Sequence, residues 1–111
     1  MTTLLIKSKA TESQTEEMLS ALDSYIKVAV DIRRGVLAGG GVMHADCEKV
    51  LIESGSKQVD IWGGDWYPED KRVAFGSLIN IRPRQNNRTM EMQDSKIRQQ
   101  MELIIRGLLE I

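Results

Sequence analysis

Two strand-like runs separated by a short turn constrain the fold of this chain more than any other feature. Residues 25–31 read Tyr-Ile-Lys-Val-Ala-Val-Asp, and residues 36–38 read Val-Leu-Ala. Both runs are rich in residues that favour β-structure, and Arg33-Arg34-Gly35 between them supplies a turn that contains glycine. The two runs therefore predict a β-hairpin, which makes this part of the sheet antiparallel.

Further segments have the pattern of strands. Leu4–Ile6 is a short apolar run that predicts an edge strand, and residues 59–62 begin another extended run that Gly63-Gly64 interrupts. Apolar residues occupy every second position but one from Val73 to Ile81, which is the clearest strand pattern in the chain. Pro68 to Lys71 predicts a turn before that strand.

Three segments have features of helices. Residues 13–23 predict a helix with a capping box made by Ser13 and Glu16. Residues 43–52 fit either a helix or a strand, and their apolar spacing favours the helix. Asp94 caps a last helix with an apolar stripe, which consists of Ile97, Met101, Ile104, Ile105 and Leu108.

Apolar residues of the last helix also lie outside that stripe. Leu103, Leu109 and Ile111 widen the apolar surface beyond one third of the circumference. Such an excess predicts a partner, and a second copy of the same chain is the simplest one. We therefore expect a homodimer.

The composition limits the class of protein. The chain has 111 residues, of which 41% are apolar, with 15 basic and 16 acidic residues and one cysteine. These values fit one domain spanning residues 1–111 and exclude a disordered chain, an internal disulfide and a zinc site of several cysteines. The chain has no long apolar run and no apolar leader at Met1 to Lys7, so we expect a cytoplasmic protein without a membrane span. The predicted fold is α+β, a small antiparallel sheet with two or three helices packed on one face.

Three motifs resemble a known family. They are Gly-Gly-Gly-x-x-His-Ala-Asp-Cys-Glu at 39–48, Gly-Ser-Lys-Gln-x-Asp-x-Trp-Gly-x-Asp-Trp-Tyr-Pro at 55–68, and Ser-Leu-Ile-Asn-Ile-Arg-Pro-Arg-Gln-Asn-Asn-Arg at 77–88. Together they resemble a family of small prokaryotic proteins classed as a domain of unknown function. The resemblance covers roughly residues 20–110 and implies one compact domain. It implies no activity, cofactor or catalytic residue.

The segment from Arg82 to Arg88 is the strongest candidate for a binding site. It holds three arginines, and no acidic residue occurs between Lys71 and Glu91. Arginine binds phosphate and carboxylate with two parallel hydrogen bonds, and amide side chains recognise polar ligands and base edges. Trp62 and Trp66 would add rings that stack on a base or sugar. The predicted ligand-binding residues are Arg82, Arg84, Gln85, Asn86, Asn87, Arg88, Trp62 and Trp66. The alternative is that the arginines pair with local acids and the tryptophans belong to the core or to a dimer contact.

A second candidate site combines His44, Asp46, Cys47 and Glu48. Histidine together with nearby carboxylates or a thiol can bind a metal ion or form the catalytic group of a hydrolytic enzyme. The alternative is a buried Cys47 and a His44 that is hydrogen-bonded to a carboxylate.

The sequence therefore leaves three functions open. The first is a binding or accessory module that contacts an anionic, phosphate-bearing ligand or nucleic acid, without a cofactor. The second is a small hydrolytic enzyme that uses His44 with Asp46 or Glu48, with or without a metal. The third is a structural subunit of a homo-oligomer.

Overall fold

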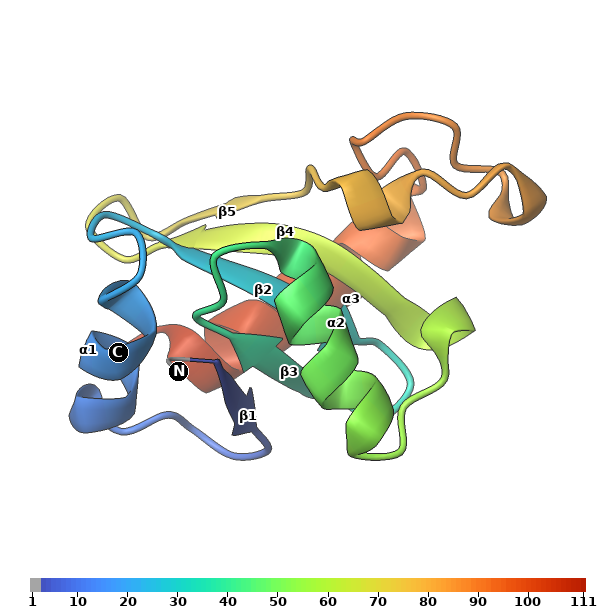
Figure 1. The fold of residues 1–111 in the computed structure, drawn as a ribbon. Helices are drawn as coiled ribbons and strands as arrows, with labels where there is room; N and C mark the ends of the chain where they lie inside the picture. The colour runs from blue at the N-terminus through green and yellow to red at the C-terminus, as the bar shows by residue number, and fades with distance from the viewer. Residues whose placement is uncertain (1–2) are drawn as a thin grey trace.

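The computed structural model describes residues 3–111 and folds them into a five-stranded sheet with three α-helices (Figure 1). The strands are β1 (Leu4–Ile6), β2 (Ile26–Asp31), β3 (Val36–Gly39), β4 (Ile61–Tyr67) and β5 (Arg72–Ala74), in the order β1-β3-β2-β4-β5. Every neighbouring pair is antiparallel. The helices are α1 (Glu12–Leu19), α2 (His44–Glu53) and α3 (Ser95–Leu109), and three single 3₁₀ turns are η1 (Gln58–Asp60), η2 (Leu78–Asn80) and η3 (Pro83–Gln85). The predicted α+β class with an antiparallel sheet is confirmed.

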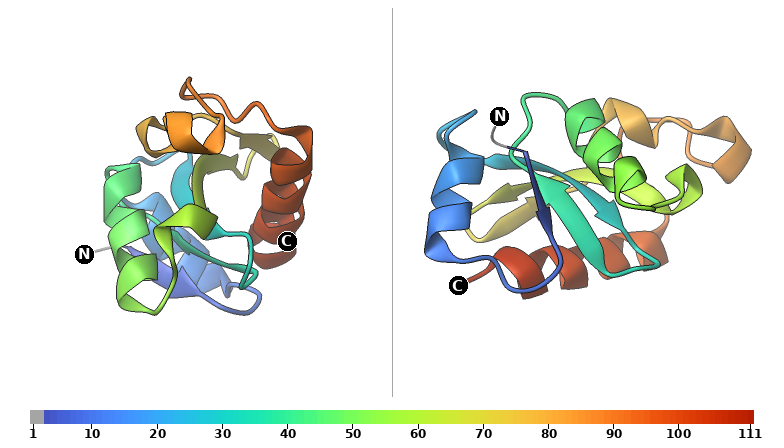
Figure 2. Two further views of the ribbon diagram at one scale, coloured as in Figure 1. Left: turned by 90° about the vertical axis from the view of Figure 1, so that its right-hand side faces the viewer. Right: turned by 60° about the horizontal axis from the view of Figure 1, so that its bottom comes forward.

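The sheet separates two apolar cores, because alternate residues of a strand point to opposite faces. Val28 of β2 packs in the larger core with Met18 of α1 and Met101 of α3. Ala29, its neighbour in the chain, packs in the smaller core with Cys47 of α2. Figure 2 shows α2 and α3 on opposite sides of the sheet. Two helices, α1 and α3, thus share one face as predicted, and α2 covers the other.

The predicted hairpin is formed by β2 and β3, and its turn is fixed by a buried carboxylate. Asp31 is fully buried and accepts hydrogen bonds from the backbone N–H groups of Arg33 and Arg34, at 2.9 and 3.0 Å. Its second oxygen accepts a 2.6 Å bond from the Ser56 hydroxyl. Gly35 has φ of +70°, a conformation that glycine adopts without strain. The turn is therefore tied to the segment that follows α2.

The capping box predicted for the first helix is wrong. The hydroxyl of Thr11 accepts a bond from the Gln14 N–H at 3.1 Å, and the Gln14 side chain accepts one from the Thr11 N–H at 3.0 Å. Threonine and glutamine fit this motif as well as Ser13 and Glu16 do, so the cap lies two residues earlier than predicted and the helix begins at Glu12. It also ends at Leu19 instead of extending to residue 23.

The other two helices agree with their predictions. The segment that fitted either a helix or a strand forms α2, as its apolar spacing favours. Asp94 caps α3 by accepting a 2.8 Å bond from the Lys96 N–H. Leu109 is 2% exposed and joins the larger core, so it is not part of an excess apolar surface, whereas Leu103 is 75% exposed.

The strand predicted from Val73 to Ile81 is confirmed only at Val73 and Ala74 and is wrong from Phe75 onward. Strand β5 ends at Ala74, and residues 78–80 form η2. The reason is Asn80, whose fully buried side chain accepts a 2.8 Å bond from the Gly63 N–H and donates a 2.9 Å bond to the Gly63 carbonyl. One amide side chain thus bonds to both the N–H and the carbonyl of Gly63. The backbone of a longer β5 would otherwise pair with these two groups.

The expected interruption at Gly63-Gly64 is also wrong, because β4 runs through both glycines. A Cβ atom at Gly63 would lie 2.6 Å from the Ser77 side chain, and one at Gly64 would lie 2.6 Å from the Ala74 carbonyl oxygen. The two glycines therefore let neighbouring segments approach the strand closely.

Candidate functional site

Arg82 serves the internal structure of the predicted loop. Its guanidinium donates to the carbonyl oxygens of Ile79 at 2.9 Å and Gln58 at 2.7 Å, and to that of Ile61. Its planar group lies over the Trp62 ring, 4.3 Å from the ring centroid. Burial lowers the pKa of Arg82, which the nearby Glu48 carboxylate opposes. Since each of these contacts ties one segment to another, Arg82 positions the loop.

The amide side chains also hold the loop together. Asn87 is 2% exposed; its amide group faces the carbonyl oxygens of Asn80, Thr89 and Glu91 at 2.8–3.1 Å, and its carbonyl accepts a bond from the Gln93 N–H. Backbone bonds join Arg82 and Asn87 in both directions, at 2.6 and 3.1 Å. Gln85 accepts a bond from Arg82 and donates one to the Val59 carbonyl. The arginine loop, by which we mean residues 82–88, is therefore closed by its own hydrogen bonds.

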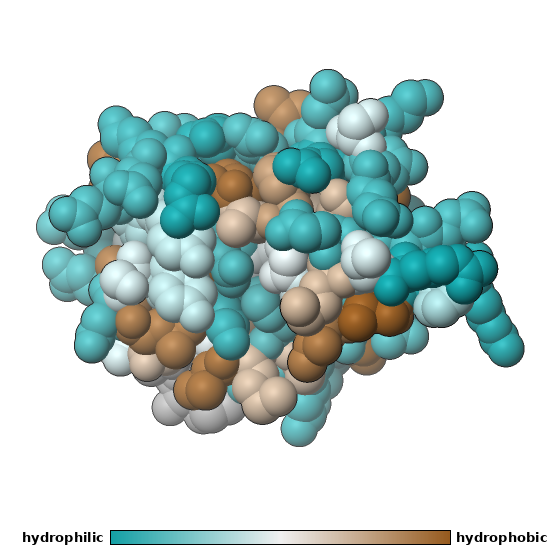
Figure 3. Space-filling model, turned by 90° about the horizontal axis from the view of Figure 1, so that it is seen from above, coloured by the Kyte–Doolittle hydropathy of each residue, from teal (hydrophilic) through white to brown (hydrophobic). Residues whose placement is uncertain are grey.

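Three of the predicted binding residues remain at the surface of this loop. Arg84, Asn86 and Arg88 are exposed, and Asn86 has the left-handed conformation that asparagine tolerates. Neither Arg84 nor Arg88 has a salt bridge to any residue from 3 to 111. The loop projects from the body of the protein in Figure 1, and Figure 3 shows hydrophilic side chains reaching outward at the same end.

A hollow lies beside Arg84. Its volume is about 610 Å³, and it is lined by Gln58, Val59, Arg82, Pro83, Arg84 and Gln85. Val59 is exposed, so the hollow offers apolar surface next to guanidinium groups.

The tryptophans belong to the core. Trp62 and Trp66 are 1% and 2% exposed and pack in the larger core with the residues of α3. Arg82 lies over one face of Trp62, and Arg106 lies 5.6 Å from the centroid of Trp66. Neither ring presents a free face to a ligand in this structure.

The four residues of the second candidate site have four different surroundings. His44 Nε2 lies 3.0 Å from Asp65 Oδ1 and 2.9 Å from the Gly64 carbonyl oxygen. Asp46 accepts a 3.0 Å bond from the Met43 N–H at the start of α2. Glu48 faces Arg82, with 3.7 Å between Oε2 and Nη2.

Cys47 is fully buried in the smaller core. Burial raises the pKa of its thiol to about 11, so the nucleophilic thiolate is scarce at neutral pH. Sequence reasoning proposed Asp46 and Glu48 as partners of His44, but it did not find Asp65, which β4 brings to His44 from 21 positions away. No group of three or more metal-ligating side chains gathers within residues 3–111.

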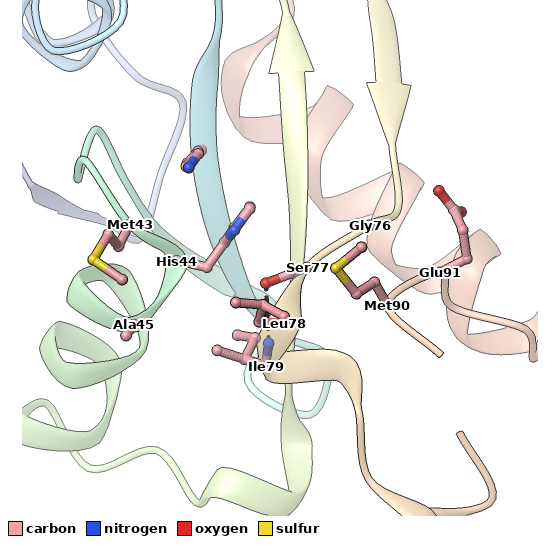
Figure 4. A pocket seen from close by; sticks show the side chains of 10 residues that line it. Met43, His44, Ala45, Gly76, Ser77, Leu78, Ile79, Met90 and Glu91 are labelled. Carbon is pink, nitrogen blue, oxygen red and sulfur yellow. Dashed lines mark hydrogen bonds between the residues drawn. The ribbon is translucent and has the colours of Figure 1, made fainter. Parts of the chain in front are cut away.

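A second cleft was not predicted from the sequence. Figure 4 shows it between the start of α2 and the segments that follow β5, with Met43, His44 and Ala45 on one side and Gly76, Met90 and Glu91 on the other. Its volume is about 490 Å³, and its remaining lining residues are Lys27, Ser77, Leu78 and Ile79. We call it the methionine cleft. The sequence carries no local signal for this cleft, because the alternation at residues 77–79 predicts a strand, whereas η2 turns Leu78 outward to 68% exposure.

Comparisons with known proteins place the chain in a family but assign no chemistry. A family model described as "Protein of unknown function (DUF5674)" matches residues 4–108. No curated protein and no solved structure matches the chain. Among residues 3–111, no helix is both long enough and apolar enough to cross a membrane.

Proposed function

Because the chain belongs to the DUF5674 family, whose description assigns no activity, we propose a function from its exposed groups. We propose a binding module that holds a phosphate-bearing ligand, such as a nucleic acid, on the arginine loop. The observation that carries this proposal is the pair of exposed guanidinium groups of Arg84 and Arg88, which have no salt bridge within the described residues and sit on a loop closed by hydrogen bonds.

The bracing of the loop favours binding. A guanidinium on a mobile loop loses conformational entropy when it binds, whereas a loop fixed beforehand loses less. Here Arg82 and Asn87 fix the backbone on both sides of Arg84. Their role is to position the loop, and the direct contacts fall to Arg84, Asn86 and Arg88.

The hollow beside Arg84 suits a ligand with both a charged and an apolar part. A guanidinium group can bind two phosphate oxygens with two parallel hydrogen bonds. The side chains of Val59 and Pro83, which line the same hollow, offer contact to a flat or apolar group. A nucleotide unit combines these two parts. The formal net charge is −1, so attraction must be local to this end of the molecule.

The test compares two charge-removing variants of the full chain. We expect Arg84→Ala with Arg88→Ala to weaken binding of a labelled single-stranded oligonucleotide at least about tenfold. The slope of log K against log salt should fall by about 1.4, because each phosphate contact on a single strand contributes about 0.7. Fluorescence anisotropy at several salt concentrations measures both quantities.

The matched control removes two exposed charges elsewhere, with Lys7→Ala and Lys9→Ala. Equal losses in both variants would show that only net charge matters and would refute the assignment to the loop. Competition with inorganic polyphosphate separates the two ligand sources: displacement indicates phosphate recognition alone, and resistance indicates recognition of the nucleotide. The free energy of unfolding of the loop variant should stay within about 0.5 kcal/mol of the wild-type value, whereas a structural role for the two arginines would lower that free energy clearly.

The homodimer and the cytoplasmic location stay predictions. On α3 the exposed apolar group is Leu103, beside a shallow hollow lined by Gln99, Glu102 and Arg106. Light scattering of wild type and Leu103→Glu measures whether this surface holds two copies together.

A further inference from the structure

The methionine cleft gathers exposed apolar side chains around polar groups. Met43, Leu78 and Met90 are all at least half exposed, and all three line the same cleft from segments far apart in the sequence. In Figure 3, apolar groups lie among hydrophilic ones on the upper face of the molecule. A volume of about 490 Å³ falls within the range of roughly 300–1,000 Å³ that is typical of small-ligand sites. Methionine side chains adapt to apolar ligands of varied shape.

The charges of the cleft are separated onto opposite sides. Lys27 lies directly across from Asp65 in the pairing of β2 with β4, and Asp65 accepts from His44, so Lys27 belongs to the side formed by the start of α2. Glu91 lies on the other side, next to Gly76 (Figure 4). Neither the Lys27 ammonium nor the Glu91 carboxylate has a hydrogen-bond or ion-pair partner in the part of the chain that the structure describes.

This arrangement selects the ligand by charge. An anion would meet repulsion from Glu91, and a cation would meet repulsion from Lys27. A ligand that is neutral in sum, with a carboxylate at one end, an ammonium at the other and an apolar body between them, satisfies both groups and covers the apolar walls. A short apolar peptide with free ends has this chemistry.

We propose that the methionine cleft binds short apolar peptides, with the peptide carboxylate beside Lys27 and the peptide ammonium beside Glu91. The ring of His44 lines the same side of the cleft as Met43, and Asp65 and the Gly64 carbonyl hold its orientation. This site is separate from the arginine loop and does not depend on the function proposed there.

The test is a titration of the full chain with trileucine, followed by two-dimensional amide NMR, which also measures weak affinities. We expect the shifts to centre on the start of α2 and on residues 76–79. Amidation of the peptide carboxylate and acetylation of its amine should each weaken binding about two- to fivefold. The first loss should vanish in Lys27→Met and the second in Glu91→Gln.

A matched pair of apolar variants locates the body of the peptide. Leu78→Ala should weaken binding about three- to tenfold, whereas Leu103→Ala, a similarly exposed leucine outside the cleft, should leave it unchanged. Both side chains are exposed, so neither change endangers the fold, and the NMR spectrum itself confirms folding. The proposal is overturned if trileucine causes no shifts at millimolar concentration, or if the shifts lie elsewhere. It is also overturned if blocking either end of the peptide leaves the affinity unchanged, or if both leucine variants lose affinity equally.

Discussion

Replacing Asn80 should reveal how much of the fold rests on one side chain. In Asn80→Ala, the N–H and the carbonyl of Gly63 both lose their partners inside the protein. The Phe75 and Met90 carbonyls, which Asn80 also contacts, keep backbone donors from Met92 and Ser77, at 3.0 and 3.1 Å. The loss is therefore concentrated at Gly63.

The magnitude follows from these two groups. A buried polar group left without a partner costs about 1–3 kcal/mol, so two of them cost about 2–6 kcal/mol. Total stabilities of domains are about 5–15 kcal/mol, so this single change removes a large share. We expect a fall of about 4 kcal/mol in the free energy of unfolding, within the range from these two groups.

Urea unfolding followed by tryptophan fluorescence measures this loss, because Trp62 is adjacent to Gly63 in β4. Asn86→Gly is the control, since it removes an exposed asparagine side chain at a position whose φ of 62° suits glycine. The control should change stability by less than about 0.5 kcal/mol. A loss below about 1 kcal/mol in Asn80→Ala would refute the reasoning that Asn80 replaces a strand.

A second substitution tests the direction of the hydrogen bonds. Asn80→Asp keeps an acceptor for the Gly63 N–H but turns an oxygen toward the Gly63, Phe75 and Met90 carbonyls. The ionised form is disfavoured there, so the pKa of the introduced carboxyl rises above its unfolded value. Any stability that its protonated form retains is present at low pH and lost as pH rises. The difference in free energy of unfolding between Asn80→Asp and wild type should therefore be larger at pH about 8 than at pH about 4, as measured by the same urea unfolding.

Two other predictions concern close packing and the thiol. Gly64→Ala should lower stability by about 1–3 kcal/mol, because the new Cβ meets the Ala74 carbonyl oxygen at 2.6 Å. Gly107→Ala should raise stability by up to about 1 kcal/mol, because nothing lies within 4 Å of its new Cβ and alanine favours a helix more than glycine does. Thermal unfolding compares the two variants, and equal effects would contradict the close contact at Gly64. Burial raises the pKa of Cys47 from 9.0 to about 11, so its contribution to stability is present below pH 9.0 and lost as pH rises through about 11. Cys47→Ala should therefore show a smaller decline in stability than wild type over that window, and parallel curves would disprove the shift.

The parts of the fold predicted correctly depend on neighbouring residues. The hairpin follows from two β-rich runs around Gly35, and α3 follows from an Asp94 cap and a repeated apolar stripe. Local pattern fixes such elements because their hydrogen bonds close within a few residues or between adjacent runs.

The errors arose where a distant segment decides the outcome. The alternation from Val73 to Ile81 is that of a strand, yet Asn80 bonds to Gly63, 17 positions away, and ends the strand early. No local signal separates this asparagine from one in a turn. The same reason applies to Arg82, whose donors reach carbonyls 21 and 24 positions earlier.

In the candidate sites too, features set by neighbouring residues could be predicted, and features set by distant segments could not. Exposed arginines at 84 and 88 could be anticipated, because a polar loop after a proline lies at the surface. The pairing of His44 with Asp65 could not, because it depends on how α2 lies across β4.

The position of α3 in the chain has a consequence for synthesis. Met101, Ile105 and Leu109 supply one wall of the larger core, and the carbonyl of Leu108 accepts a 2.8 Å bond from the N–H of Ala10. All five strands precede α3 in the sequence, so during synthesis they emerge from the ribosome before the helix that covers them. Until α3 emerges, the apolar face of the sheet stays open to water and to other nascent chains, and the larger core closes only when the last of its segments has been made.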